Sequence, residues 1–568
     1  MLRLYEVKLP LHHSEDELRD AVISRLGIDP SELTDISVYK RSYDARRKAN
    51  ILLIYQLDVA LAENIETGVL NRISNPSLVR SSPDTQYQPV AEFTSEFPTG
   101  NQQRPIVIGF GPCGILAALQ LAQMGLKPIV LERGQDVRQR TKDTWGLWRN
   151  RKLNTESNVQ FGEGGAGTFS DGKLYTQVKD PRFLGRKVLT EFVKAGAPEE
   201  ILFVAKPHIG TFKLVTMVEH MRAEIIRLGG EILFGQKVTA LHRAPIVDDS
   251  GYTGQITGVT LDNGEKLNSR HVILAIGHSA RDTFSMLLDL GVYIEAKPFS
   301  IGLRIEHPQS MIDEAQFGEE TGNPILGSAD YKLVHHCKNG RSVYSFCMCP
   351  GGTVVAATSE EGRVVTNGMS QYSRNERNAN SAIVVGVTPE KDYPGHPLAG
   401  VDLQIQLEEL AYELGGSNYN APVQLVGDFL NGLPTRKLAS AVPSYKPGVT
   451  PADLSGALPE FVVNAIREAI VAFDKKIKGF AMNDAILTGI ETRTSSPISI
   501  KRDKSFQNIN TLGLYPAGEG AGYAGGILSA GIDGIKVAEA VAIDLLRQGF
   551  TGKATSAGLP RAVASVEK

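Results

Sequence analysis

The stretch PIVIGFGPCGILAALQLAQMGLKPIVLER, residues 105–133, decides how the rest of the chain can fold. Ile106 to Ile108 is a β-branched run that predicts a short buried strand, and it passes through three glycines into an apolar helical pattern. A second strand is predicted from Pro128 to Leu131, and it ends at Glu132. Strand, glycine turn, helix and second strand together predict a βαβ unit.

Each part of this unit has a physical role if a dinucleotide binds there. Gly109 permits the tight turn off the strand, Gly111 lets the backbone approach a pyrophosphate, and Gly114 lets the helix pack closely on the sheet. The helix that begins near Pro112 offers unpaired N–H groups and the positive end of its dipole to the phosphates.

The tip of the second strand carries Glu132, which is followed by Arg133. A carboxylate at this position accepts two hydrogen bonds from the hydroxyls of an adenosine ribose and repels a 2′-phosphate, so we expect FAD or NAD rather than NADP. A lone GxGxxG is weak evidence. The flanking strands, the helix and the acidic tip favour a nucleotide site over a βαβ unit with no ligand.

Length and composition describe an ordinary globular protein. The 568 residues are enough for about two to four domains whose cores need no disulfide or metal. The net charge of -3 gives no global field for nucleic acid or an anionic membrane. No segment resembles a signal peptide or a membrane span, and four cysteines fit a reducing compartment, so we expect a cytoplasmic protein.

Residues 1–75 predict a small separate α/β unit. Ser14 and Glu17 form a capping box ahead of a helical pattern. The basic run KRSYDARRK, residues 40–48, is interpreted as a solvated hairpin turn, and the alternative is a contact for a phosphate, a nucleic acid or the main body. Residues 76–104, rich in Pro, Ser, Thr and Gln, are interpreted as a linker.

A glycine-rich loop, FGEGGAGTFSDGKLYT at residues 161–176, follows the βαβ unit. Its glycines let backbone amides approach a flavin or a phosphate closely, and Ser170, Asp171 and Lys173 add polar groups. A flexible surface loop is the alternative, but the aromatic residues of the segment suit a solvated linker poorly.

The remaining segments predict a discontinuous α/β fold. A hairpin with Asn263-Gly264 as its turn leads to a buried strand that opens at Gly277 and His278. Short alternating runs after residue 297 predict an antiparallel sheet, and Thr511 to Leu545 predicts a strand, a glycine turn and a helix. The expected units are 1–75, a linker at 76–104, a Rossmann-like FAD-binding domain at 105–296 and 481–550, a substrate or cap domain at 297–480, and a frayed tail at 551–568.

Three distant stretches, GFGPCG, AIGHSA at 275–280 and LYPAGEGAGYAGGI, together resemble the FAD-binding fold of the glutathione-reductase-type flavoprotein superfamily. In that superfamily the closing motif carries an Asp toward the ribityl or pyrophosphate region, and here the residue is the longer Glu519. More narrowly, the segments KPFSIGLRIEHPQ, SFCMCPGG and ETRTSSP are similar to a bacterial family catalogued as uncharacterised FAD-dependent dehydrogenases. The resemblance covers about residues 100–545.

The resemblance implies FAD as cofactor and a helix that begins at Gly526-Ile527 with its N-terminus aimed at the N1 and C2=O edge of the isoalloxazine, where its dipole stabilises the reduced anion. The residues expected to bind FAD are Gly109, Gly111, Pro112, Cys113, Gly114, Glu132, Arg133, Gly164, Gly165, Gly167, Thr168, Ser170, Asp171, Lys173, Val238, Ala275, Gly277, Gly518, Glu519, Gly525, Gly526 and Ile527.

Candidate catalytic groups are fewer. Arg493, and Arg304 with His307, are expected either to hold an anionic substrate against the flavin or to form structural ion pairs such as Arg493 with Glu491. His278 is expected to touch FAD or cap a turn, with proton transfer as the alternative.

The cysteines suggest no metal site and little redox chemistry. Cys347 and Cys349 are interpreted as buried apolar side chains, with a redox pair as the alternative if a turn brings them together. Zinc is not expected, because a structural site needs four ligands.

The sequence therefore predicts an FAD-dependent oxidoreductase that exchanges a hydride between flavin N5 and a small-molecule substrate, with an anionic substrate as one option. No second GxGxxG follows a strand, so NAD(P)H would dock transiently. One alternative is a flavoprotein whose N-terminal unit binds RNA or a protein, with FAD structural or redox-sensing. A monooxygenase is another. No stable nucleic acid and no membrane partner are expected, and the sequence leaves the oligomeric state open.

Overall fold

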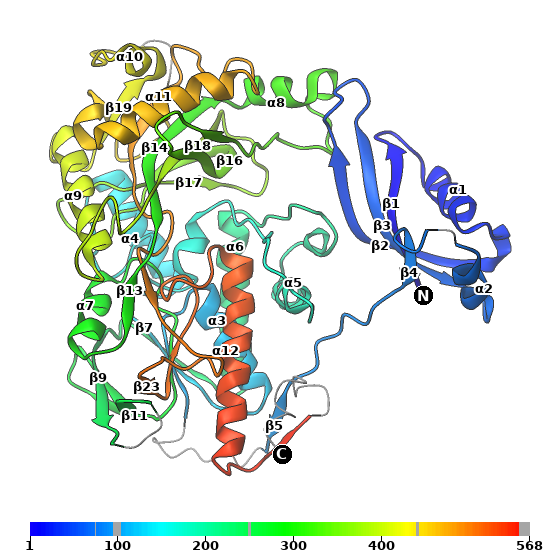
Figure 1. Cartoon of the computed structure of the whole chain (residues 1–568), viewed down its shortest axis with the longest axis horizontal. Coiled ribbons are helices and arrows are strands. Elements are labelled where there is room, and N and C mark those ends of the chain that lie inside the picture. Colours follow the sequence, from blue (N-terminus) through cyan, green and yellow to red (C-terminus); the bar gives the residue numbers. More distant parts are fainter. Residues whose placement is uncertain (74, 95–103, 248–250, 439–441, 556–568) are drawn as a thin grey trace.

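The computed structural model describes residues 1–73, 75–94, 104–247, 251–438 and 442–555. Parts of the predicted linker (95–103) and tail (556–568) lie outside these residues. The chain forms a small N-terminal domain, a parallel sheet with helices, and an antiparallel sheet packed above it (Figure 1). This mixed architecture is the expected α/β class. No helix in the described residues is long and apolar enough to cross a membrane.

The N-terminal domain is an antiparallel sheet with two helices beside it, and it lies at one side of the main body (Figure 1). Ser14 caps α1 (Glu15–Leu26) and the predicted capping box with Glu17 is present. A second helix, α2, spans Ile65–Arg72. The strands lie in the order β2 (Leu33–Asp44), β3 (Leu52–Leu61), β1 (Leu2–Pro10) and β4 (Val79–Ser81), so the last strand comes from the predicted linker.

Five short parallel strands form the centre of the main body. Their order is β24 (Leu514–Pro516), β12 (Val272–Leu274), β6 (Ile106–Ile108), β7 (Ile129–Glu132) and β8 (Glu231–Phe234). The segment from Glu231 to Pro245 forms two strands, because Gly235, with φ 65°, turns the chain before β9 (Val238–Pro245). β9 pairs with β10 (Gly254–Leu261), and β10 with β11 (Lys266–Asn268), as the predicted hairpin.

Two helices pack against each other beside this sheet, α3 (Pro112–Gln123) and α12 (Ile527–Arg547) (Figure 1). Their separation is set by Gly534, because a Cβ there would lie 2.3 Å from the carbonyl oxygen of Cys113. Gly114 plays the same part against β6, since its Cβ would lie 2.0 Å from the carbonyl oxygen of Gly109. The remaining helices of this domain are α4 (Val137–Asn150), α5 (Leu184–Lys194), α6 (Thr211–Arg227) and α7 (Arg281–Asp289).

The second large sheet is antiparallel apart from one edge strand. Its order is β15 (Val334–His336), β16 (Ser342–Ala356), β18 (Asn378–Val387), β14 (Phe299–Pro308), β21 (Ile486–Glu491), β19 (Ala421–Leu425) and β20 (Val449–Pro451), with β17 (Thr366–Ser370) beside β16. We had assigned residues 481–550 to the FAD-binding domain, but β21 lies between β14 and β19. The antiparallel sheet therefore continues past residue 480. Helices α9 (Ala399–Leu414) and α11 (Glu460–Asp474) flank it.

A short strand pair joins the segment after α12 to the predicted linker. β25 (Gly552–Ala554) pairs with β5 (Ala91–Phe93) of the predicted linker. The expected fraying of the tail is thus wrong for residues 552–554, because their backbone groups are bonded in this ladder.

The α3–α12 crossing is tested by Gly534→Ala. We expect a loss of about 1–3 kcal/mol in the free energy of unfolding, because the new methyl group overlaps a backbone carbonyl that cannot move freely. Urea unfolding followed by circular dichroism measures it. The matched control is Gly68→Ala in α2, where no described atom lies within 4 Å of the new Cβ and stability is expected to be unchanged or higher.

Candidate functional site

A pocket follows the carboxyl edge of the parallel sheet, where β6, β7, β12 and β24 all end. Its far end is closed by residues of the antiparallel sheet and the segment after it, among them Phe346, Cys347 and Thr494. The empty space along these elements is about 1560 Å³, a volume that includes the part open to solvent.

Two helix N-termini open into this pocket. α3 begins after Gly111 and α12 after Gly526, and these glycines have no side chain with which to cap their helices. The first N–H groups of such helices need acceptors, and their dipoles favour an anion. Gly526 also leaves open space, because no described atom lies within 4 Å of a Cβ placed there. Gly277 does the same from the end of β12.

Glu132 lies buried at the end of β7 and is held by backbone amides. Its Oε2 accepts from Phe110 N at 2.8 Å, and its Oε1 accepts from Gly134 N and Gly162 N at 2.9 Å each. Each carboxylate oxygen accepts about two hydrogen bonds. Oε2 therefore has room for one further hydrogen-bond donor.

The glycine-rich loop forms one wall of the pocket. Gly165, with φ 59°, lies against Gly111, so the loop touches the phosphate-binding turn directly. The loop is anchored by Asp171, whose buried carboxylate pairs with Lys173 at 2.8 Å and accepts from Arg374 Nε at 2.9 Å. The loop is therefore a fixed wall and not a flexible surface segment.

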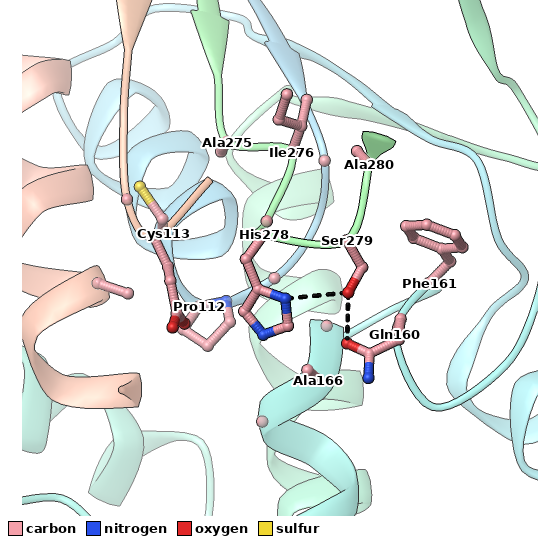
Figure 2. Close-up of a pocket in the computed structure, with 18 of the residues that line it drawn as sticks. Pro112, Cys113, Gln160, Phe161, Ala166, Ala275, Ile276, His278, Ser279 and Ala280 are labelled. Carbon is pink, nitrogen blue, oxygen red and sulfur yellow. Dashed lines mark hydrogen bonds between the residues drawn. The ribbon is translucent and has the colours of Figure 1, made fainter. Parts of the chain in front are cut away.

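His278 lies at the centre of the pocket (Figure 2). Its Nδ1 is 2.9 Å from the Ser279 hydroxyl, which donates to Gln160 Oε1 at 3.1 Å. Burial lowers the pKa of His278 to about 3, and Arg493 and Arg281 add to this effect. The imidazole is therefore neutral at physiological pH and suits hydrogen bonding better than general acid catalysis.

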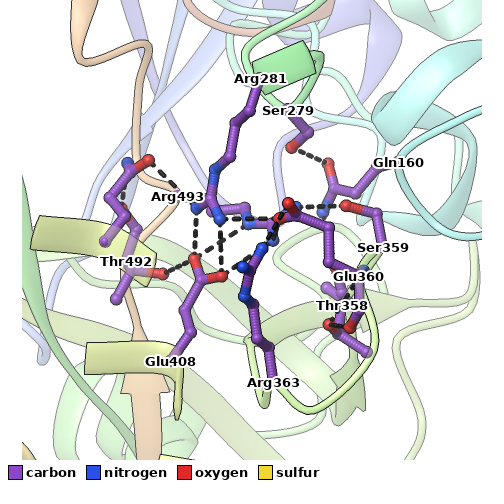
Figure 3. A network of polar contacts seen from close by, with 12 residues as sticks. Gln160, Ser279, Arg281, Thr358, Ser359, Glu360, Arg363, Glu408, Thr492 and Arg493 are labelled. Atoms are coloured by element: carbon purple, nitrogen blue, oxygen red, sulfur yellow. Dashed lines mark hydrogen bonds and ion pairs between the residues drawn. The ribbon is translucent and has the colours of Figure 1, made fainter. Parts of the chain in front are cut away.

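Arg493 belongs to a buried charge network (Figure 3). Glu408 of α9 is 2.6 Å from Arg281 Nη2 and 2.9 Å from Arg493 Nη2, and Glu360 contacts both arginines. Burial acts to raise the pKa of Glu408, but the two guanidinium groups outweigh it and hold this pKa well below its usual range. Arg493 lines the pocket, yet its donors go to Glu408, Glu360 and Ser359, and not to Glu491 as in the expected pair.

Of the two roles expected for Arg304, the structure shows the structural ion pair. Its side chain is fully buried, pairs with Glu491 at 3.0 Å and donates to Asn380 at 2.7 Å, and it is not among the described residues that line the pocket. His307 is likewise buried and bonded to the carbonyl oxygen of Phe480. Both are structural, because a strand buried on both faces has to satisfy its polar groups internally.

Comparison with known proteins agrees with this geometry. Residues 298–494 match the family model described as "FAD-dependent protein, C-terminal domain-like", and residues 1–60 match a domain of unknown function, DUF8436. A protein of Clostridium beijerinckii, recorded as uncharacterized, is 47% identical over 542 residues, which is 95% of this chain and 98% of the relative. The chain belongs to this family of FAD-dependent proteins.

Solved structures share the fold only distantly with this FAD-dependent protein. The halogenase PltM is 12% identical with a TM-score of 0.36, covering 79% of this chain and 71% of its own. The L-amino acid deaminase of Proteus vulgaris is 11% identical with a TM-score of 0.33, covering 82% and 96%. At these scores the likeness says nothing about the reaction.

FAD is the cofactor of the family, and the pocket fits it. The open positions at Gly277 and Gly526 and the uncapped α3 and α12 provide a cradle for a pyrophosphate-bearing ligand. The residues predicted to bind FAD that line this pocket are Gly109, Gly111, Pro112, Cys113, Glu132, Arg133, Gly165, Gly167, Ser170, Asp171, Lys173, Val238, Ala275, Gly277, Gly518, Glu519, Gly526 and Ile527.

Four other predicted residues are not among the described lining of the FAD-dependent protein's pocket: Gly114, Gly164, Thr168 and Gly525. Gly114 packs on β6, and the Thr168 hydroxyl bonds inward to the carbonyl oxygen of Glu163. A Cβ on Gly164 would meet the Thr168 hydroxyl at 2.0 Å, so Gly164 also faces inward.

Sequence reasoning did not single out some of the lining residues. Gln160, Lys237, Phe346, Asn367 and Thr494 line the pocket of the FAD-dependent protein from separate elements. Asn367 and Phe346 come from β17 and β16, whose approach to the parallel sheet is a tertiary contact. Local signals existed for three of them, because Gln160 directly precedes the glycine-rich loop and Phe346 and Thr494 lie within the SFCMCPGG and ETRTSSP segments.

Glu408→Gln tests the charge network. We expect a loss of about 3–5 kcal/mol in the free energy of unfolding, because two buried guanidinium groups lose their shared carboxylate. Chemical denaturation measures it. Glu413→Gln, at an exposed position of the same helix, is the control and is expected to change stability by less than about 0.5 kcal/mol. Equal stability of the two variants would contradict the assignment.

Proposed function

We propose that this protein is an FAD-dependent oxidoreductase that exchanges a hydride with a small-molecule substrate bound between the flavin and the antiparallel sheet. One observation supports it most. The pocket begins at the phosphate-binding turn and ends against residues of the second sheet, among them Phe346, Cys347 and Asn367. A dinucleotide held at the first end points its ring toward this second wall. When bound, FAD supplies hydride transfer at N5.

The chain's own residues bind and position the cofactor, and one of them can hold a proton. Glu132 and the α3 N-terminus hold the adenosine and pyrophosphate end, and the α12 N-terminus faces the other half of the cofactor. Burial raises the pKa of Glu519 to about 7, and nearby Lys297 offsets part of that effect. A carboxyl group with this pKa can hold or release a proton at neutral pH beside the ring.

We also propose membership of the glutathione-reductase-type superfamily, supported by the parallel sheet, the β9–β10–β11 meander and the closing helix α12. NAD(P)H would dock transiently, and the expected location is the cytoplasm. No stable nucleic acid is proposed. In the basic run, Arg46 pairs with Asp44, and Arg41 bonds through its backbone to Phe203 and Ala205 of the main body.

An anaerobic screen tests the proposed function. The flavin absorbance of the purified protein is followed while NADH, NADPH and panels of small organic acids, alcohols and amines are added. We expect at least one class to bleach the flavin and an acceptor to restore it. Hydroxylated product in air would favour the monooxygenase instead. Folded protein that takes up no FAD would overturn the proposal.

Gly111→Ala separates cofactor binding from folding. The new Cβ would lie 3.5 Å from Gly165 Cα, an ordinary contact, so the fold is expected to persist. It would obstruct the close approach of the pyrophosphate, and we expect FAD affinity to fall about tenfold or more. Fluorescence titration of the apoprotein with FAD measures this. Gly68→Ala, remote from the pocket, is expected to leave FAD affinity unchanged.

Glu519→Gln tests the proposed proton carrier. In the wild-type protein the rate of flavin bleaching is expected to change with an inflection near pH 7, where the Glu519 carboxyl group titrates. The variant keeps the size of the side chain but cannot ionise, so the inflection is expected to disappear. Stopped-flow absorbance across the pH range shows the result, and an unchanged profile would exclude this role.

A further inference from the structure

Two cysteines of β16 lie where the antiparallel sheet meets the pocket. Cys347 lines the pocket, and the neighbouring Cys349 is fully buried. Within the described residues both are free thiols. In a regular strand, residues two apart point to the same face but at separate positions along the chain, and strand geometry holds their side chains well apart.

The strand is irregular at this point. The register between β16 and β18 shifts between Phe346 and Cys349, and Cys347 has φ 46°, which is uncommon for a residue with a side chain. A bulge of this kind re-aims side chains. As a result the two thiols lie close enough to interact, and Cys349 Sγ donates a hydrogen bond to the carbonyl oxygen of Cys347 at 3.3 Å.

Cations surround the pair. The hydrogen bond from Cys349 lowers the pKa of Cys347 to about 6, and Lys173 and Arg304 counter the opposing effect of burial. The same hydrogen bond, together with burial, raises the pKa of Cys349. The pair therefore holds one thiolate and one thiol at neutral pH, which is the reactive form of a dithiol. Lys173 is fixed beside it by Asp171 and the carbonyl oxygen of Met348.

The flavin ring belongs at this end of the pocket. Gly109, Gly111 and Glu132 place the pyrophosphate and ribose at the other end, and the remaining length of the pocket leads to Cys347. A thiolate and a redox-active ring therefore share one enclosed space.

We propose that Cys347 and Cys349 form a dithiol–disulfide couple that exchanges two electrons with the bound FAD. The inference rests on the proposed function, because it needs the flavin in this pocket. When the couple is oxidised, the Cys347 thiolate and the Cys349 sulfur form an S–S bond and the S–H bond of Cys349 breaks. Two electrons and that one proton pass to oxidised FAD, and reduced FAD reverses the step. The chain thus carries a second redox centre.

A reductive titration of the FAD-loaded protein tests this. Air-oxidised protein is titrated with dithionite without oxygen, and thiols are counted by alkylation in denaturant and mass spectrometry before and after. Wild-type protein is expected to consume twice the electrons that its flavin requires. Of the four cysteines, two are expected to be unreactive before reduction, in a peptide that contains Cys347 and Cys349, and all four to react afterwards.

Matched variants locate the effect. Cys347→Ser and Cys349→Ser are expected to consume only the electrons of the flavin, whereas Cys337→Ala, at a buried thiol of another segment, is expected to behave as wild type. The thiol count on the wild-type chain needs no variant and stands even if a substitution prevents folding.

The failure modes are distinct. Flavin-loaded wild-type protein with four reactive thiols before reduction and no extra electron uptake would overturn the dithiol couple and leave the proposed function in place. Folded protein with no flavin in its absorbance spectrum would overturn the proposed function, and this inference with it.

Discussion

The close approach of α3 and α12 is the constraint on which the pocket depends. At Gly534 there is no room for even a methyl group against the backbone of α3, so glycine fixes the separation of the two helices. Because each helix begins at a glycine that opens into the pocket, this packing delivers two positive helix ends to one space. Such ends need an anionic partner, and a pyrophosphate provides one. The packing of α3 against α12 therefore also shapes the cofactor pocket.

A second constraint fixes the antiparallel sheet over the first. Glu408 lies in a helix of the upper layer, while Arg281 begins α7 of the lower layer and Arg493 follows β21. A carboxylate buried between two guanidinium groups is stable only while all three groups stay paired, because separating them would leave a buried charge unpaired. The network thus holds the far wall of the pocket in register with the phosphate-binding turn, and Arg493 serves position rather than substrate capture.

Local patterns predicted the parts of the fold that depend on short-range physics. The βαβ unit at 105–133, the Ser14 capping box and the Asn263-Gly264 hairpin all appear where the residues placed them, because each is decided within a few positions. The Glu408–Arg493 pair could not be predicted, since its members lie 85 positions apart. The partner of Arg304 could not be predicted for the same reason, because Glu491 is brought next to it only by the pairing of β14 with β21.

Three cationic side chains near the wall formed by the antiparallel sheet are each paired with a carboxylate. Lys173 is matched by Asp171, Arg304 by Glu491 and Arg493 by Glu408, so none presents an unopposed charge to an anionic substrate. Their remaining influence falls on Cys347, where Lys173 and Arg304 favour the thiolate. The sequence pattern did not predict that Cys347 and Cys349 approach each other, because strand periodicity assumes a regular strand. The bulge in β16 makes the strand irregular at this point. The charged side chains of this wall therefore favour the Cys347 thiolate over an anionic substrate from solution.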